Sequence, residues 1–265
     1  MKNARYIVPN FFTSLNFLLG VWAILLVTGA IEFLSITQIP AVLASHLVVY
    51  CVLMDKLDGF AASLMNARSE FGAQFDSLAD LIAFGVAPAI CLLKAYQELT
   101  PEWYADNQIL LLACISAYML CAAMRLARYN AVDADANPDF FLGLPSTLAG
   151  GFNVVFLIIA IEYDFFRADN PLLPALAIFM LLSSMMMLTT FYLPKFKSRE
   201  NKILNIIQFF GILTGYALGF AMKFTEILLA LISAYAIFGF GYGFVVRMSE
   251  NDHDDSDSEL GRITR

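Results

Sequence analysis

The chain has 265 residues, of which 60% are hydrophobic and only 15% carry a charge. A soluble globular domain typically has about 25% charged residues, so this composition excludes an ordinary soluble domain. The mean hydropathy of +0.70 and the 24 phenylalanines lead to the same conclusion, and much of the net charge of −7 comes from the C-terminal segment. We therefore expect an all-α integral membrane protein that contacts membrane lipids and has no nucleic-acid partner.

Eight apolar runs are long enough to cross a hydrocarbon core of about 30 Å as helices that rise about 1.5 Å per residue. In chain order they cover approximately Asn10–Val27, Ile36–Ser63, Ala73–Tyr96, Asn107–Arg128, Gly143–Ile161, Pro171–Tyr192, Ile203–Met222 and Glu226–Arg247. The sequence thus predicts a bundle of about eight transmembrane helices in one membrane-embedded domain, residues 1–247. Residues 248–265 are rich in Asp and Ser and have little apolar surface, which predicts a disordered acidic tail.

The distribution of Lys and Arg predicts the orientation of these helices. With a cytoplasmic N-terminus, thirteen of the sixteen basic residues fall in cytoplasmic loops or helix ends, and only Lys94, Arg167 and Lys223 lie outside. Cytoplasmic loops of membrane proteins carry an excess of Lys and Arg. We therefore expect both termini in the cytoplasm and a multi-pass protein of the cell's inner membrane.

Four aspartates lie in segments that otherwise predict membrane helices. Asp55 and Asp58 are three residues apart near the cytoplasmic end of the second predicted span, and Asp76 and Asp80 are four residues apart in the third. Residues with these spacings share one face of a helix. Because a short loop joins the two antiparallel helices, all four carboxylates can point toward each other. An ionisable residue at membrane depth is costly and usually marks a functional site.

Four carboxylates in one cavity repel each other, so they must take up protons or bind cations. Oxygen ligands without a nearby His or Cys select Mg²⁺, Mn²⁺ or Ca²⁺ over zinc. Two cations that share bridging carboxylates are the natural interpretation, and such a pair suits displacement at phosphorus. As an alternative, the aspartates pair only with Lys56, Arg68 and Arg125 and have a structural role.

The same residues resemble a known signature. The CDP-alcohol phosphatidyltransferase family has the pattern D-x-x-D-G-x-x-A-R-x8-G-x3-D-x3-D, and this chain matches all fixed positions but one, with Asp55, Asp58, Gly59, Ala62, Gly72, Asp76 and Asp80. Where the family has arginine, this chain has Ser63. The departure affects a phosphate contact, for which Arg68, five residues later, is a candidate substitute.

The resemblance implies a reaction in which an alcohol attacks the phosphorus of CDP-diacylglycerol or a similar CDP-alcohol and releases CMP. It implies a divalent metal cofactor, Mg²⁺ or Mn²⁺, with two ions per active site, and a homodimer. The implied metal ligands are Asp55, Asp58, Asp76 and Asp80, of which Asp80 also acts as the catalytic general base toward the incoming hydroxyl. The implied nucleotide-binding positions are Gly59, Ala62, Ser63, Arg68 and Gly72.

Sequence beyond the signature is similar to the branch of this family that uses L-serine as the acceptor, the CDP-diacylglycerol-serine O-phosphatidyltransferases. The similar stretches include residues 75–88, 125–130 and 141–146. This resemblance implies CDP-diacylglycerol and L-serine as substrates. Arg125 and Arg128, at the cytoplasmic end of the fourth predicted span, are placed to bind the serine carboxylate. Alternatively, both arginines follow the positive-inside rule or bind lipid headgroups.

Two other functions stay open. The first is an enzyme of the same family that uses another acceptor alcohol, such as glycerol 3-phosphate, an inositol phosphate or choline. The second is a cation or proton transporter, in which membrane carboxylates bind the transported ion. A transporter needs ionisable residues or broken helices along a path through the membrane. The aspartates cluster at one end of their helices, and residues 47–53 and 81–93 continue no polar path. This arrangement favours the enzyme.

The first predicted span begins with an unusually polar stretch. Asn10, Thr13, Ser14 and Asn16 all fall within its first seven residues. Helix capping and interhelical hydrogen bonds explain such residues most simply. A second explanation is that their side chains line the site formed by the next two spans.

Glycines predict close helix packing at two further places. Gly143 and Gly150 open the fifth predicted span, where small residues permit either close packing or a re-entrant loop. Gly211, Gly215 and Gly219 recur every four residues and form a small-residue face. That face suits helix contact within the chain or in a dimer.

Overall fold

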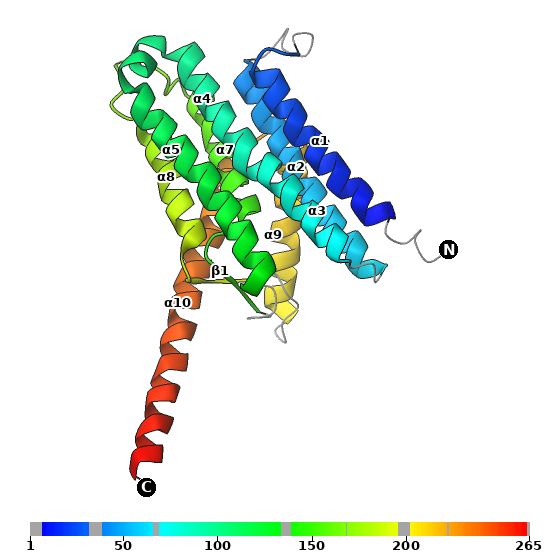
Figure 1. Cartoon of the computed structure of the whole chain (residues 1–265), viewed down its shortest axis with the longest axis vertical. Coiled ribbons are helices and arrows are strands. Elements are labelled where there is room, and N and C mark those ends of the chain that lie inside the picture. Colours follow the sequence, from blue (N-terminus) through cyan, green and yellow to red (C-terminus); the bar gives the residue numbers. More distant parts are fainter. Residues whose placement is uncertain are drawn as a thin grey trace.

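The computed structural model describes residues 7–31, 39–65, 69–133, 139–167, 169–195, 202–221 and 223–263, most of which are helical (Figure 1). The helices are α1 (Ile7–Val27), α2 (Pro40–Leu64), α3 (Glu70–Asp80), α4 (Ala87–Leu99), α5 (Pro101–Arg128), α7 (Ser146–Glu162), α8 (Ala175–Leu188), α9 (Lys202–Ala221) and α10 (Thr225–Ile263). Two π-helical segments, η2 (Leu81–Val86) and η3 (Tyr129–Asp133), and two strands, β1 (Phe140–Leu142) and β2 (Tyr192–Pro194), complete the described elements.

Five helices in the described part of the chain are long and apolar enough to cross a membrane. They cover Ile7–Val27, Pro40–Gly59, Glu70–Leu99, Pro101–Val132 and Thr225–Ser249. The apolar helices α7 and α8 are shorter, with 17 and 14 residues. The structure thus agrees with a helical, multi-pass membrane protein. Of the eight predicted spans, five meet the length and hydropathy expected of a membrane-crossing helix in the described residues.

The third long helix is continuous from α3 through η2 to α4, and Pro88 explains its π-helical segment. Proline has no backbone N–H, so the carbonyl of Phe84 loses its usual donor one turn later. The hydroxyl of Tyr118 in α5 donates to this carbonyl at 2.7 Å instead. A Cβ atom on Gly150 of α7 would lie 2.8 Å from the Phe84 Cα, so α7 crosses η2 in close contact. Of the two alternatives for Gly150, the structure shows close packing.

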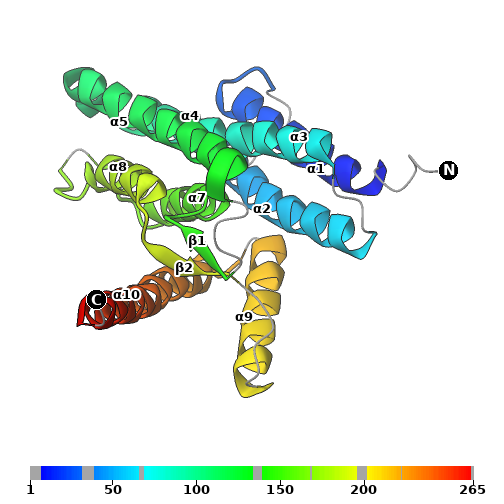
Figure 2. The same ribbon diagram turned by 60° about the horizontal axis from the view of Figure 1, so that its bottom comes forward.

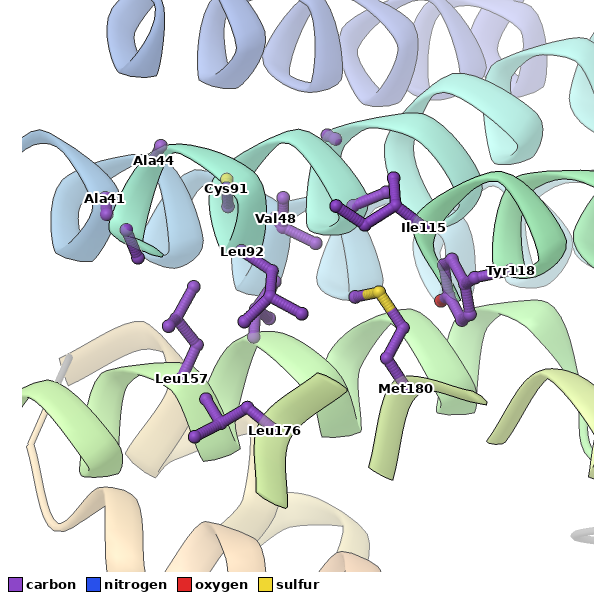
Figure 3. Close-up of a cluster of buried hydrophobic side chains, with 14 of the residues drawn as sticks. Ala41, Ala44, Val48, Cys91, Leu92, Ile115, Tyr118, Leu157, Leu176 and Met180 are labelled. Carbon is purple, nitrogen blue, oxygen red and sulfur yellow. The ribbon is translucent and has the colours of Figure 1, made fainter. Parts of the chain in front are cut away.

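The core lies where α2, α4, α5, α7 and α8 meet (Figure 3). Small residues such as Ala44 and Cys91 are fully buried, and larger ones such as Leu157 and Met180 fill the space between the helices. Lipid tails are as apolar as these side chains, so close van der Waals contact rather than removal from water holds such helices together. This packed core fixes the helices that carry the aspartates.

The two short strands are an addition to the predicted all-α fold. They pair antiparallel, with Phe141 opposite Leu193, and lie between α7 and α10 (Figure 2). Gly143 ends β1 with a φ of +73°, a conformation that favours glycine, and a Cβ atom there would lie 2.7 Å from the Thr189 carbonyl oxygen. Three-residue strands give too short a pattern to be read from sequence, because period-2 alternation needs at least about four residues.

The C-terminal helix differs from the expectation for residues 248–265. Composition predicted a disordered tail, but α10 continues through the acidic segment to Ile263. Its last part projects away from the other helices (Figure 1). Adding a residue to an existing helix is far easier than starting a new one, so an apolar helix can extend into a segment that has no core of its own.

Candidate metal and active site

The structure brings the predicted aspartates together. Ligand oxygens of Asp55, Asp76 and Asp80 all lie within 4.8 Å of one another. Asp58 lies in the same cavity, and its side chain interacts with that of Asp76. Asp58 and Asp80 are each 6% exposed. The helical spacing that predicted one shared face for each pair of aspartates is therefore confirmed.

The aspartates line a cavity of about 430 Å³ between α2, α3, α5 and the start of α7. Its wall consists of Asp55, Lys56, Asp58, Gly59, Ala73, Asp76, Ser77, Asp80, Arg125, Leu126, Tyr129, Asn130, Phe141, Pro145 and Thr147. No His or Cys occurs in this described lining. The donors are thus hard carboxylate oxygens, the ligands that Mg²⁺ and Mn²⁺ accept.

The cations near the cluster do not satisfy all of its carboxylates. Lys56 Nζ lies 3.0 Å from Asp55 Oδ2, which is the one ion pair within the described part of the site. Even so, Asp76 Oδ1 is buried without a hydrogen-bond partner among the described residues. Buried carboxylate oxygens without partners are costly, so the cluster fits a bound cation better than a purely structural network.

Helix α1 contributes two direct contacts to the aspartates. Thr13 Oγ1 donates a hydrogen bond to Asp58 Oδ2 at 3.1 Å. Asn16 Nδ2 donates to Asp80 Oδ1 at 3.2 Å. Both are interhelical hydrogen bonds, and the acceptor in each is a carboxylate of the site. The polar start of α1 therefore forms interhelical hydrogen bonds and borders the site at the same time. Ser14 instead donates to the backbone carbonyl of Asn10 in its own helix.

The two arginines at the end of α5 have different surroundings. Arg125 is 7% exposed and lines the acidic cavity. Its Nη1 donates to Ser146 Oγ at 2.8 Å, and its guanidinium lies 5.3 Å from the centre of the Tyr129 ring. Arg128 is not part of the cavity lining. Its guanidinium donates to four backbone carbonyls, those of Leu142, Met187, Leu188 and Thr189.

Arg128 therefore holds the C-terminal end of α8 against β1, and its loss is expected to destabilise the protein. Carbonyls at a helix end lack intrahelical donors, and a hydrogen bond to a charged group contributes about 1.5–3 kcal/mol. Arg128→Met should lower the free energy of unfolding by about 2–4 kcal/mol on this basis. Thermal unfolding of the purified protein in detergent measures the change, and an unaltered transition would contradict this role.

The predicted nucleotide-binding positions divide into three groups. Gly59 lines the acidic cavity, and a Cβ atom there would meet nothing within 4 Å. Ala62 and Gly72 lie outside the described lining, and the Gly72 N–H donates to Ser69 Oγ, which caps the start of α3. The side chain of Ser63 and the whole of Arg68 lie outside the described residues.

A second, apolar cavity of about 410 Å³ adjoins the acidic one. It is lined mainly by α2, α7, α9 and α10, and it shares Lys56, Phe141, Pro145 and Thr147 with the acidic cavity. Gly211 and Gly215 line this cavity, and a Cβ atom on either would meet nothing within 4 Å, whereas one on Gly219 would lie 3.2 Å from Val49 Cγ1 of α2. The predicted small-residue face thus makes one helix contact and otherwise borders a cavity.

Some site residues were not predicted. Asn130 donates to Ser77 Oγ at 2.8 Å across the cavity, and Tyr129 and Thr147 complete the wall. Ser77 immediately follows Asp76, and Tyr129 and Asn130 follow Arg128. Their positions next to predicted site residues were the one sequence feature that could have indicated a place in the site. Polar residues at helix ends have many possible partners, which is why sequence alone did not assign them.

These features define a class of protein: a bundle of apolar helices that gathers four carboxylates in one cavity and places an apolar cavity beside it. The family can now be stated. The chain belongs to the CDP-alcohol phosphatidyltransferase family, whose family model matches residues 6–238.

Individual curated relatives are similar to about half of the chain or to most of it. A CDP-diacylglycerol--serine O-phosphatidyltransferase of Helicobacter pylori is 31% identical over 237 residues, which cover 89% of this chain and 91% of that relative. Proteins of the same name from Mycobacterium bovis and Methanocaldococcus jannaschii are 34% and 33% identical over 57% and 52% of this chain. These matches cover 49% and 54% of the respective relatives.

Proposed function

We propose that this protein transfers the phosphatidyl group of CDP-diacylglycerol to the hydroxyl of L-serine, giving phosphatidylserine and CMP. The observation that carries the proposal is the junction of a four-carboxylate cavity with an apolar cavity. A nucleotide linked to a lipid needs both environments, one for its pyrophosphate with a cation and one for its acyl chains. The serine-specific names of relatives that match most of the chain support the choice of acceptor.

Asp55, Asp58, Asp76 and Asp80 would hold two divalent cations, Mg²⁺ or Mn²⁺. The partnerless Oδ1 of Asp76 and the close approach of Asp55, Asp76 and Asp80 support this assignment. Such cations, when bound, offset the charge of the pyrophosphate and the charge that develops on CMP. Asp80 takes the proton from the serine hydroxyl. The serine oxygen forms a bond to the phosphorus of the phosphatidyl group while the bond from that phosphorus to CMP breaks.

Other residues bind the nucleotide and the lipid. Gly59 leaves room for the nucleotide to approach α2, because it presents no side chain to the cavity. Ser63 and Arg68 are proposed to contact phosphate, and Ala62 and Gly72 to border the nucleotide. The apolar cavity would take acyl-chain segments, which match its hydrocarbon lining.

Arg125 is proposed to bind the serine carboxylate. It is the one arginine in the described lining of the acidic cavity, whereas the Arg128 guanidinium is engaged by backbone carbonyls. An arginine and a carboxylate can form a charge-assisted pair with two parallel hydrogen bonds.

Arg125→Ala is therefore expected to raise the KM for serine by about 10- to 100-fold, since such a bond contributes about 1.5–3 kcal/mol. The KM for CDP-diacylglycerol should change much less. Initial rates with each substrate varied separately measure both constants. Arg167→Ala, an exposed arginine outside the site, is the control. An unchanged serine KM in Arg125→Ala would remove this assignment.

The acceptor itself is tested with purified protein. Labelled CDP-diacylglycerol is offered with L-serine, glycerol 3-phosphate, an inositol phosphate or choline in parallel, with Mn²⁺ or Mg²⁺ present. We expect CMP release and a labelled lipid product with serine. If another alcohol supports release and serine does not, the same transfer chemistry with that alcohol replaces the proposal.

We further propose the membrane arrangement that the basic residues predicted. Residues 1–247 form the membrane-embedded domain, both termini face the cytoplasm, and the site opens to the cytoplasm of the cell. Serine is water-soluble and CDP-diacylglycerol is held in the bilayer, so a site at the cytoplasmic surface of the inner membrane receives both. A homodimer is proposed on the family resemblance.

A further inference from the structure

Two buried polar residues of α1 touch the aspartates although the family signature lies wholly in α2 and α3. Thr13 is 4% exposed and Asn16 is 0% exposed. Thr13 donates to Asp58, and Asn16 donates to Asp80, at 3.1 and 3.2 Å. One residue of each signature helix thus has a hydrogen bond from a third helix.

Close packing of α1 on η2 explains how Asn16 reaches Asp80. A Cβ atom on Gly20 would lie 2.9 Å from the Cα atom of Ala83. Gly20 lies one turn after Asn16 in α1, and Ala83 lies three residues after Asp80. The missing side chain at Gly20 lets the two backbones approach, and the short asparagine side chain then spans the remaining distance.

Asn16 also has an acceptor that protein atoms do not use. Its Oδ1 is buried and has no hydrogen-bond partner among the described residues. Buried polar atoms usually have a hydrogen-bond partner, because an unpaired one costs about 1–3 kcal/mol. The unpaired oxygen beside Asp80 indicates that a donor belonging to bound ligand or water completes this part of the site.

We infer that Thr13 and Asn16 are positioning residues that hold the carboxylates of Asp58 and Asp80 for cation binding. Each donates to one carboxylate oxygen, which fixes the orientation of the group and leaves its second oxygen for a cation. Groups that hold metal ligands in this way commonly change metal affinity or activity by about 10- to 100-fold when mutated. This inference rests on the proposed function, because it assumes that the carboxylates bind divalent cations.

Binding of Mn²⁺ to the purified full-length protein in lipid nanodiscs tests the inference, with free Mn²⁺ measured by electron paramagnetic resonance. Thr13→Val and Asn16→Ala should each weaken Mn²⁺ binding by about tenfold or more. Thr13→Ser keeps the hydroxyl and should bind as the unmodified protein does. Ser14→Ala is the matched control, because Ser14 lies on the same helix and bonds only within it. Asn16→Leu keeps the branched shape of the side chain without the amide, in case Asn16→Ala does not fold.

A second measurement separates positioning from damage to the fold. Thr13→Val and Asn16→Leu should regain much of their transfer rate at high Mn²⁺, since a weaker site fills when more metal is added. Folded variants that bind Mn²⁺ as the unmodified protein does would overturn the inference. So would equal losses in Thr13→Ser and Thr13→Val. If the unmodified protein binds no Mn²⁺, the proposed metal site itself fails, which is a different result.

Discussion

Asp80→Asn is expected to lower the rate of serine-dependent CMP release by about 10²- to 10⁴-fold, the range that a general base contributes. Asparagine has nearly the same shape as aspartate, but it accepts no proton and is a weaker cation ligand. Asp80 is 6% exposed and lies beside Asp55 and Asp76, which are proposed to hold the cations rather than to take the proton. Single-turnover release of labelled CMP measures the loss.

Measuring CDP-diacylglycerol binding by the same variant separates a loss of chemistry from a loss of the substrate site. Asp80→Asn should still bind CDP-diacylglycerol, because Gly59 and the apolar cavity stay in place. Asp106→Asn, an exposed position near the start of α5, is the matched control and should keep full activity. A transporter that has no CDP-lipid site would show no such binding in any variant. A rate near that of the unmodified protein would exclude Asp80 as the base.

Removal of divalent cations is expected to abolish activity and to lower the temperature of unfolding. Carboxylate oxygens of three aspartates lie within 4.8 Å of one another, and without a cation their negative charges repel. A ligand present at about 100 times its dissociation constant stabilises the folded state by about 2.7 kcal/mol. Treatment with EDTA, followed by return of Mg²⁺ or Mn²⁺, should remove and then restore both activity and thermal stability.

Asp76→Asn shows whether the aspartates cause this effect. It removes one charge from the cluster, so the variant should be more stable than the unmodified protein when both are free of metal. It should also gain less stability from added Mn²⁺. An equal gain in both proteins would mean that the cation binds elsewhere. Activity that persists in EDTA would contradict the proposed two-metal site.

The sequence by itself determined the features that depend on spacing within one helix. Asp55 and Asp58, and likewise Asp76 and Asp80, share a helical face by their spacing, and a short connection makes their helices neighbours. The apolar runs also predicted where most helices lie. These predictions hold because helical periodicity is local and because a membrane helix must pair its backbone groups within itself.

Only the tertiary structure decided features that depend on contacts between distant segments. Arg125 and Arg128 look alike in sequence, yet the first lines the cavity and the second binds the end of α8, because that helix ends beside Arg128. Pairing of β1 with β2 joins residues about fifty positions apart. The extension of α10 also departed from what composition predicted.

The residues of the site also divide into those that the sequence predicted and those that only the packing of the helices revealed. The family signature pointed to the carboxylates, but the contacts of Thr13 and Asn16 with them became visible only once α1 was packed against η2. The sequence marked these residues as polar in an apolar helix and could not choose their partners. Spacing along one helix fixes which residues share a face, whereas packing between helices decides which atoms that face meets.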